Sequence, residues 1–167
     1  GISTSCDGPK ELYDLHRKGR NGKSAYDCFT SNLSRAREIM KDSAVNALLT
    51  VSKDNIDCLE RVIDYYVQHD FGNIFIRALN PYGYAVKNKN DLGYSTNKFL
   101  EKYRQALHYI IELNKKGIFF IESYAALLFQ RIMTPFSTGF VDLQSPAGAG
   151  ISGAIYYYNG DVYPTDE

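Results

Sequence analysis

The stretch GISTSCDGPKELYDLHR, residues 1–17, decides how the rest of the chain is interpreted. Its first residues predict a short β-strand, which Asp7-Gly8 ends in a turn and Pro9 keeps from continuing as a sheet ladder. Because chain termini are rarely part of a packed sheet, a strand that opens at residue 1 indicates an internal strand. We therefore expect the chain to be the rear part of a larger protein.

The composition is that of an ordinary globular protein of 167 residues, with 44% apolar and 23% charged residues. Nineteen acidic residues balance nineteen basic ones, so there is no electrostatic basis for nucleic acid or an anionic membrane as a partner. The longest apolar runs are too short to span a bilayer. The three widely spaced cysteines, Cys6, Cys28 and Cys58, form neither a disulfide framework nor a metal knuckle. We expect reduced thiols and a cytoplasmic protein.

Strand-like and helix-like patterns alternate along residues 1–117. After the first strand, apolar runs of strand length cover residues 44–51 and 73–79, and helical stripes follow each of the three strands. The predicted helix starts are Ser24, Asp54 or Asn55, and Ser95-Thr96, and the predicted ends of the last two helices are Phe71-Gly72 and Gly117. This alternation predicts a parallel sheet with right-handed crossovers, either doubly wound or part of a βα barrel.

The pattern changes after Gly117. Residues 123–133 predict a short helix that Thr134-Pro135 stops, and Asn159-Gly160 between two β-rich arms predicts a hairpin with a two-residue turn. We expect two domains, 1–117 and 118–167.

Each predicted strand carries polar residues on one of its two faces. These residues are Ser3, Ser5 and Asp7 in the first strand, Asn46 and Thr50 in the second, and Arg77 in the third. Polar side chains on one side of neighbouring strands suit a polar ligand at the carboxyl ends of the strands. The alternative is that these groups bond to one another or to buried water.

Other possible sites are weaker. The spacing of Asp14 and Arg17 suits either an anchor for an anionic ligand or a surface ion pair. The histidines His16, His69 and His108 have no matching acid and nucleophile beside them, and no common catalytic or nucleotide-binding motif is present. Gly148-Ala149-Gly150 fits a flexible hinge better than a phosphate loop, because it does not open a helix.

Several motifs in this order resemble radical SAM maturases. Ser5-Cys6-Asp7-Gly8-Pro9 with Tyr13–Arg17 and Ser24-Ala25-Tyr26 resembles the S-x-D-G-P…H-D-x-x-R…G-[ST]-[FY] run of that family, on the fourth strand of its partial barrel. Residues 46–51 and 74–81 resemble its fifth and sixth strands. Residues 147–150 and 159–164 resemble the opening of the SPASM extension, and residues 134–167 most resemble the maturases of the His-Xaa-Ser peptide system.

The resemblance implies an α/β fold, the C-terminal half of a partial (βα)6 TIM-like barrel with three parallel strands, followed by a small hairpin-bearing SPASM-like extension. It implies that Ser5 and Arg17 contact the methionine part of S-adenosylmethionine, that Asn46 contacts its ribose or amino acid part, and that the Leu79 backbone contacts adenine. In the intact enzyme the cofactor and a [4Fe–4S] cluster would generate a 5′-deoxyadenosyl radical that takes a hydrogen atom from a peptide or small protein.

Two departures limit what this chain can do alone. It lacks the C-x-x-x-C-x-x-C cluster motif, so we expect the fragment to be inactive and to hold no cofactor or metal. Ala147 and Thr165 stand where the family has cysteines, and neither can ligate an auxiliary cluster.

Two other functions remain open from the sequence. The first is a different αβ-barrel lyase or hydrolase with its site at the strand ends, and the second is a peptide-binding module that acts through the C-terminal hairpin. For a barrel cut at the first strand, the free edge of that strand predicts a homodimer or an exchange of elements between copies.

Overall fold

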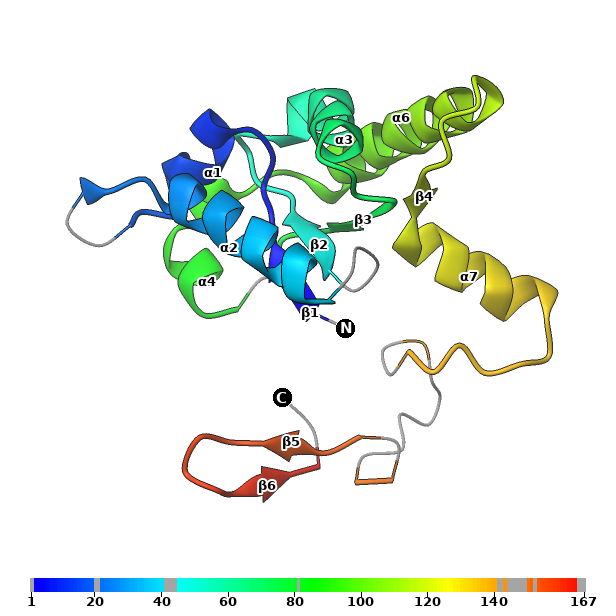
Figure 1. Ribbon diagram of the computed structural model, residues 1–167. Helices are drawn as coiled ribbons and strands as arrows, with labels where there is room; N and C mark the ends of the chain where they lie inside the picture. The colour runs from blue at the N-terminus through cyan, green and yellow to red at the C-terminus, as the bar shows by residue number, and fades with distance from the viewer. Residues whose placement is uncertain are drawn as a thin grey trace. The chain divides into compact units, whose positions relative to one another are not determined.

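The computed structural model describes residues 2–19, 22–40, 45–80, 82–140, 143, 150–151 and 153–164. The chain forms two compact units, Gly1–Ser123 and Tyr124–Glu167. The first contains β1 (Ile2–Ser5), α1 (Lys10–His16), α2 (Ala25–Met40), β2 (Val45–Thr50), the 3-10 turn η2 (Ile56–Cys58), α3 (Leu59–Gln68), β3 (Asn73–Arg77), α4 (Tyr84–Lys87), α5 (Lys89–Leu92), α6 (Thr96–Lys115) and β4 (Ile121–Glu122) (Figure 1).

The sheet of the first unit has four parallel strands in the order β1-β2-β3-β4. This arrangement confirms the predicted alternation of parallel strands with helices. The fourth strand was not predicted, because two residues are too few to show a period-two pattern. A side chain of β4 replaces a backbone hydrogen bond that this short strand cannot make. Glu122 Oε1 accepts the backbone N–H of Ile76 at 3.0 Å, where a longer strand would offer a carbonyl.

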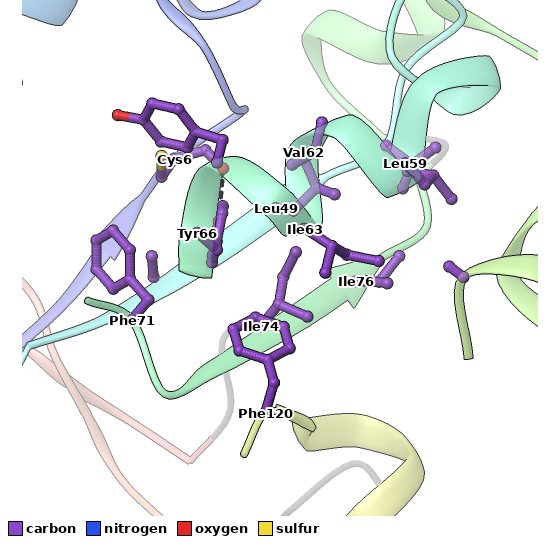
Figure 2. Packing of buried hydrophobic residues seen from close by; sticks show 14 of the residues in the cluster. Cys6, Leu49, Leu59, Val62, Ile63, Tyr66, Phe71, Ile74, Ile76 and Phe120 are labelled. Atoms are coloured by element: carbon purple, nitrogen blue, oxygen red, sulfur yellow. Dashed lines mark hydrogen bonds between the residues drawn. The ribbon is translucent and has the colours of Figure 1, made fainter. Parts of the chain in front are cut away.

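One face of the sheet is buried under the helices. Ala47, Leu49 and Val51 of β2 and the segment after it, and Ile74 and Ile76 of β3, are at most 2% exposed. Figure 2 shows Leu49, Ile74 and Ile76 packed with side chains of α3, whose apolar stripe supplies Leu59, Val62, Ile63 and Tyr66. Each large apolar side chain buried in this way contributes about 1.5–3 kcal/mol, so this layer is the main stabilising element of the unit.

The ends of the helices follow local chemistry. Ser24 accepts the backbone N–H of Asp27 and Ser95 accepts that of Lys98, as the capping patterns predict. The predicted cap at Asp54 or Asn55 is wrong, because the short turn η2 intervenes and Cys58 precedes α3. The predicted end of α3 is also wrong. The helix stops at Gln68, where Asp70 takes a left-handed conformation (φ 56°) and the N–H of Phe71 reaches the carbonyl of Tyr66.

Helix α7 (Ser123–Met133) begins at the last residue of the first unit and forms the start of the second, and it confirms the predicted helix. The second unit ends in an antiparallel hairpin of β5 (Ile155–Tyr156) and β6 (Val162–Tyr163). The loop is not the predicted two-residue turn. Tyr157 accepts the N–H of Gly160 and donates to the carbonyl of Asp161, so three residues form the loop and Gly160 (φ 92°) takes the left-handed position. Gly148, Ala149, Ala147 and Thr165 lie outside the described residues.

Among the described residues, no helix combines the length and apolar character needed to cross a membrane.

Candidate functional site

The face of the sheet opposite the buried layer, called the open face below, carries polar side chains together with Leu48 and Phe75. Register pairs Ser3 with Asn46, Ser5 with Leu48, and Thr50 with Arg77. Because side chains alternate between faces along a strand, these positions share one face. They are exposed or half-buried, whereas the intervening positions of β2 and β3 are buried. Ser5, Asn46 and Arg77 therefore lie on the same side of three adjacent strands.

Near the starts of β2 and β3, two side-chain amides on this face form a hydrogen bond with each other. The Nδ2 of Asn73 on β3 donates to the Oδ1 of Asn46 on β2 at 3.1 Å. This contact leaves the Nδ2 group of Asn46 as the donor that can meet a ligand. Asn46 lies near the start of β2, and Thr50 on the same face ends that strand.

Arg17 and Asp7 form an ion pair at the carboxyl end of β1. Asp7 does not continue the open face: β1 ends at Ser5, and the Asp7 side chain is only 7% exposed. The Arg17 Nε donates to Asp7 Oδ2 at 2.6 Å and its Nη2 to Oδ1 at 3.4 Å. Burial lowers the pKa of Arg17, but the hydrogen bond and charge of Asp7 outweigh it and raise that pKa. The guanidinium is thus fixed in place and largely neutralised.

Neither sequence hypothesis for Asp14 with Arg17 describes this arrangement. Asp14 is not paired with Arg17 but anchors the start of α2, where it accepts the Ser24 hydroxyl at 2.6 Å and the Tyr26 N–H at 2.9 Å.

A second polar cluster lies at the carboxyl end of β2, and the sequence did not indicate it. His16 Nε2 lies 2.8 Å from Asp54 Oδ2 and 3.5 Å from Ser52 Oγ, so the expectation that His16 has no acid nearby was wrong. Both contacts use the same ring nitrogen, whereas a nucleophilic relay needs the two nitrogens to face the acid and the hydroxyl separately. The cluster therefore does not form a serine-hydrolase triad.

Asn55 fixes the loop that carries this cluster. It is 2% exposed, accepts the N–H of Ser52 at 2.8 Å and donates to the carbonyl of Thr50 at 3.1 Å. A buried amide bonded on both sides holds the end of β2 in one conformation. The only sequence signal was an asparagine just after a strand, which we interpreted as a helix cap.

Leu79 lies two residues beyond β3, and its backbone N–H donates to the Tyr94 hydroxyl at 2.7 Å. Burial raises the pKa of Tyr94, so the phenol stays protonated. Since the N–H of Leu79 is occupied, its carbonyl oxygen is the backbone group that can meet a ligand.

The cysteines do not fit an iron–sulfur ligand set. Cys6 follows β1, Cys28 lies on α2 and Cys58 in η2, and no cluster of three His, Cys, Asp or Glu side chains suited to a metal occurs in the described part of the chain. Burial raises the pKa of the Cys6 thiol to about 11, the opposite of what a thiolate ligand requires. The open face, with its Ser and Asn hydroxyl and amide groups, does fit a polar organic cofactor.

No model of a known protein family matches the chain. Over 108 residues it is 31% identical to the cysteine-type anaerobic sulfatase-maturating enzyme of Clostridium perfringens strain ATCC 13124, a match that covers 59% of this chain and 28% of that enzyme. The corresponding protein of Clostridium perfringens strain 13 is 29% identical over the same length. The chain is homologous to anaerobic sulfatase-maturating enzymes. The matched part spans less than a third of these relatives.

Solved structures give the same result at the level of the fold. Native anSMEcpe with bound AdoMet and Cp18Cys peptide superposes with a TM-score of 0.71 over 98% of this chain and 44% of that chain, at 23% identity. The same protein with bound AdoMet and Kp18Cys peptide superposes with a TM-score of 0.70. The homology confirms the predicted resemblance to radical SAM maturases, and the narrower resemblance to the His-Xaa-Ser system stays a prediction.

Proposed function

We propose that the chain is the part of a radical SAM maturase that holds S-adenosylmethionine against the open face of its sheet, in an enzyme that modifies a peptide or small protein. The observation that carries this proposal is the set of polar side chains that β1, β2 and β3 present on one face, beside Leu48 and Phe75, in a chain homologous to maturating enzymes. We further propose that the narrower relationship is to the maturases of the His-Xaa-Ser system.

The residues have separate roles in this proposal. Ser5 and Arg17 hold the methionine part of the cofactor, Asn46 contacts its ribose or amino acid part, and the Leu79 carbonyl contacts adenine. Asp7 fixes the Arg17 guanidinium so that its remaining donors point in one direction. Bound S-adenosylmethionine and a [4Fe–4S] cluster supply radical chemistry, and the cluster ligands would have to come from outside this chain, whose cysteines do not form a set.

The proposal also covers location and assembly. The three free cysteines suit a reducing cytoplasm. The outer edge of β1 pairs with no strand among the described residues, and beside it lies an open hollow of about 1050 Å³ lined by Thr4, Tyr13, Cys28, Leu33 and Val45, among others. We propose that this chain covers that edge by forming a homodimer.

Calorimetric titration of the intact enzyme with S-adenosylmethionine tests the proposed site. We expect Ser5→Ala and Asn46→Ala each to weaken binding about three- to tenfold, the effect of one lost hydrogen bond. Ser34→Ala, a change on the exposed side of α2, serves as the control and should leave affinity unchanged. Wild-type affinity in both site variants would refute the assignment.

A further inference from the structure

Arg77 is a charged residue on an otherwise neutral open face. It ends β3, its side chain is exposed, and its register partner on β2 is Thr50. The other polar strand residues of this face are Ser3, Ser5, Asn46, Thr50 and Asn73. Within the described residues, no carboxylate forms an ion pair with Arg77, whereas Asp7 neutralises Arg17. The open face therefore presents one uncompensated positive charge at the carboxyl end of β3.

The position of Arg77 separates it from the proposed contacts to the cofactor carboxylate. Ser5 and Arg17 belong to the β1 side of the sheet, and β2 lies between them and β3. Two strand spacings place the backbones of β1 and β3 about 10 Å apart, so Arg77 lies on the adenine side of the proposed site and not on its carboxylate side. S-adenosylmethionine has a single carboxylate, and the group assigned to the β3 side, adenine, is neutral. The cofactor thus leaves Arg77 without an anion.

The planar donors of an exposed guanidinium without a counter-charge match a carboxylate in a two-pronged geometry. We propose that Arg77 receives a carboxylate of the peptide substrate, from an Asp or Glu side chain or the chain end, and so gives the enzyme a preference for acidic peptides. This inference rests on the proposed function. It assigns Arg77 a role in substrate selection.

Matched peptides test the preference on the intact enzyme with S-adenosylmethionine present. The probes are a short fluorescein-labelled peptide with a central Cys flanked by Asp, its counterpart with Asn, and its counterpart with Lys, measured by fluorescence anisotropy. We expect the Asp peptide to bind about tenfold more tightly than the Asn peptide, as for one charge-assisted hydrogen bond, and rising salt to reduce the difference.

Variants at Arg77 identify the source of that preference. Arg77→Gln should remove it, Arg77→Lys should keep most of it, and Arg77→Glu should favour the Lys peptide instead. Arg35→Gln, which removes an exposed arginine of α2, is the matched control and should behave as the wild type. The reversal by Arg77→Glu cannot result from misfolding, because a misfolded enzyme would lose all three peptides alike.

Each contrary outcome has a distinct meaning. Equal affinity for the Asp and Asn peptides, no measurable binding of either, or a preference that survives Arg77→Gln would overturn the inference. Weaker cofactor binding in Arg77→Gln with an unchanged peptide preference would overturn it too, and would assign the arginine to S-adenosylmethionine. A wild-type enzyme that binds peptides with the expected preference but not S-adenosylmethionine would refute the proposed function instead.

Discussion

Cys6 is the most protected of the three thiols. It is fully buried beneath α3, where the Tyr66 hydroxyl donates to its backbone carbonyl at 2.7 Å (Figure 2). Burial raises the pKa of its thiol to about 11, so almost none is thiolate near neutral pH, whereas Cys28 is exposed.

We expect iodoacetamide at pH 8 to label Cys28 first and Cys6 only after unfolding, because the thiolate is the reactive form. Peptide mass spectrometry over a time course measures the order. Cys28→Ser provides the control, since it should remove the fast phase alone. Labelling of Cys6 at the rate of Cys28 in the native protein would contradict the burial of Cys6.

Residue placement on the strands could be predicted because it follows from a period of two. That rule put Ser5, Asn46 and Arg77 on one face without any knowledge of the tertiary structure. Pairings such as Asp7 with Arg17, or His16 with Asp54, could not be predicted. These pairings depend on how the loops bring separate segments of the chain together, and the residue pattern along one strand does not contain that information.

At the scale of elements, α2 depends on a carboxylate outside it. Asp14 bonds to the Ser24 hydroxyl and the Tyr26 N–H, and the Ser24 bond above all lowers the pKa of Asp14 below its ordinary value of 3.8. A lowered pKa in the folded state means that the carboxylate form stabilises the fold. That contribution is present above about pH 4 and is lost as the pH falls through the folded pKa.

Asp14→Asn should therefore lower the melting temperature at pH 7, and the difference from the wild type should shrink toward pH 3. Thermal unfolding followed by circular dichroism at both pH values measures this. Glu38→Gln, on the exposed side of the same helix, is the control. A difference that grows at low pH would show that Asp14 acts by some means other than its charge.

The two-residue strand β4 depends on Glu122, which is 3% exposed. Its carboxylate accepts the Ile76 N–H at 3.0 Å and the Tyr103 hydroxyl at 2.6 Å. Glu122→Ala should lower the free energy of unfolding by about 2–3 kcal/mol, because it leaves buried donors unsatisfied. Urea titration measures the loss. Glu112→Ala, at an exposed ion pair on α6, should have a smaller effect, and equal effects would contradict this role.

Three details of the secondary structure were not predicted. β4 is too short for a period, η2 displaces the predicted cap of α3, and Asp70 ends α3 in a conformation more usual for glycine. A hydrogen bond from a distant segment supports β4, whereas local hydrogen bonds fix η2 and the end of α3. The existence of α3 and α6 was predicted because each has a strong apolar stripe, although the two ends of α3 were not.

At the scale of the molecule, the edge of β1 should determine assembly. The Cys6 N–H bonds to the Leu48 carbonyl, so alternation directs the N–H groups of Ser3 and Ser5 away from β2, toward the free edge. We expect a concentration-dependent dimer in light scattering. Ser3→Pro should weaken it by removing an outward donor while keeping the bonds to β2, and Ser3→Ala should not. A monomer at every concentration would exclude this assembly.

Because the two faces of the sheet differ, mutations on one face affect folding and mutations on the other affect recognition. Along β2, Ala47 and Leu49 maintain the hydrophobic layer, while Asn46 and Leu48 face outward between them. Substitutions at alternate positions can therefore change what the protein recognises without endangering its folding. Such an arrangement gives a lineage of related enzymes room to acquire new targets, because natural selection can vary one set of side chains while it conserves the other.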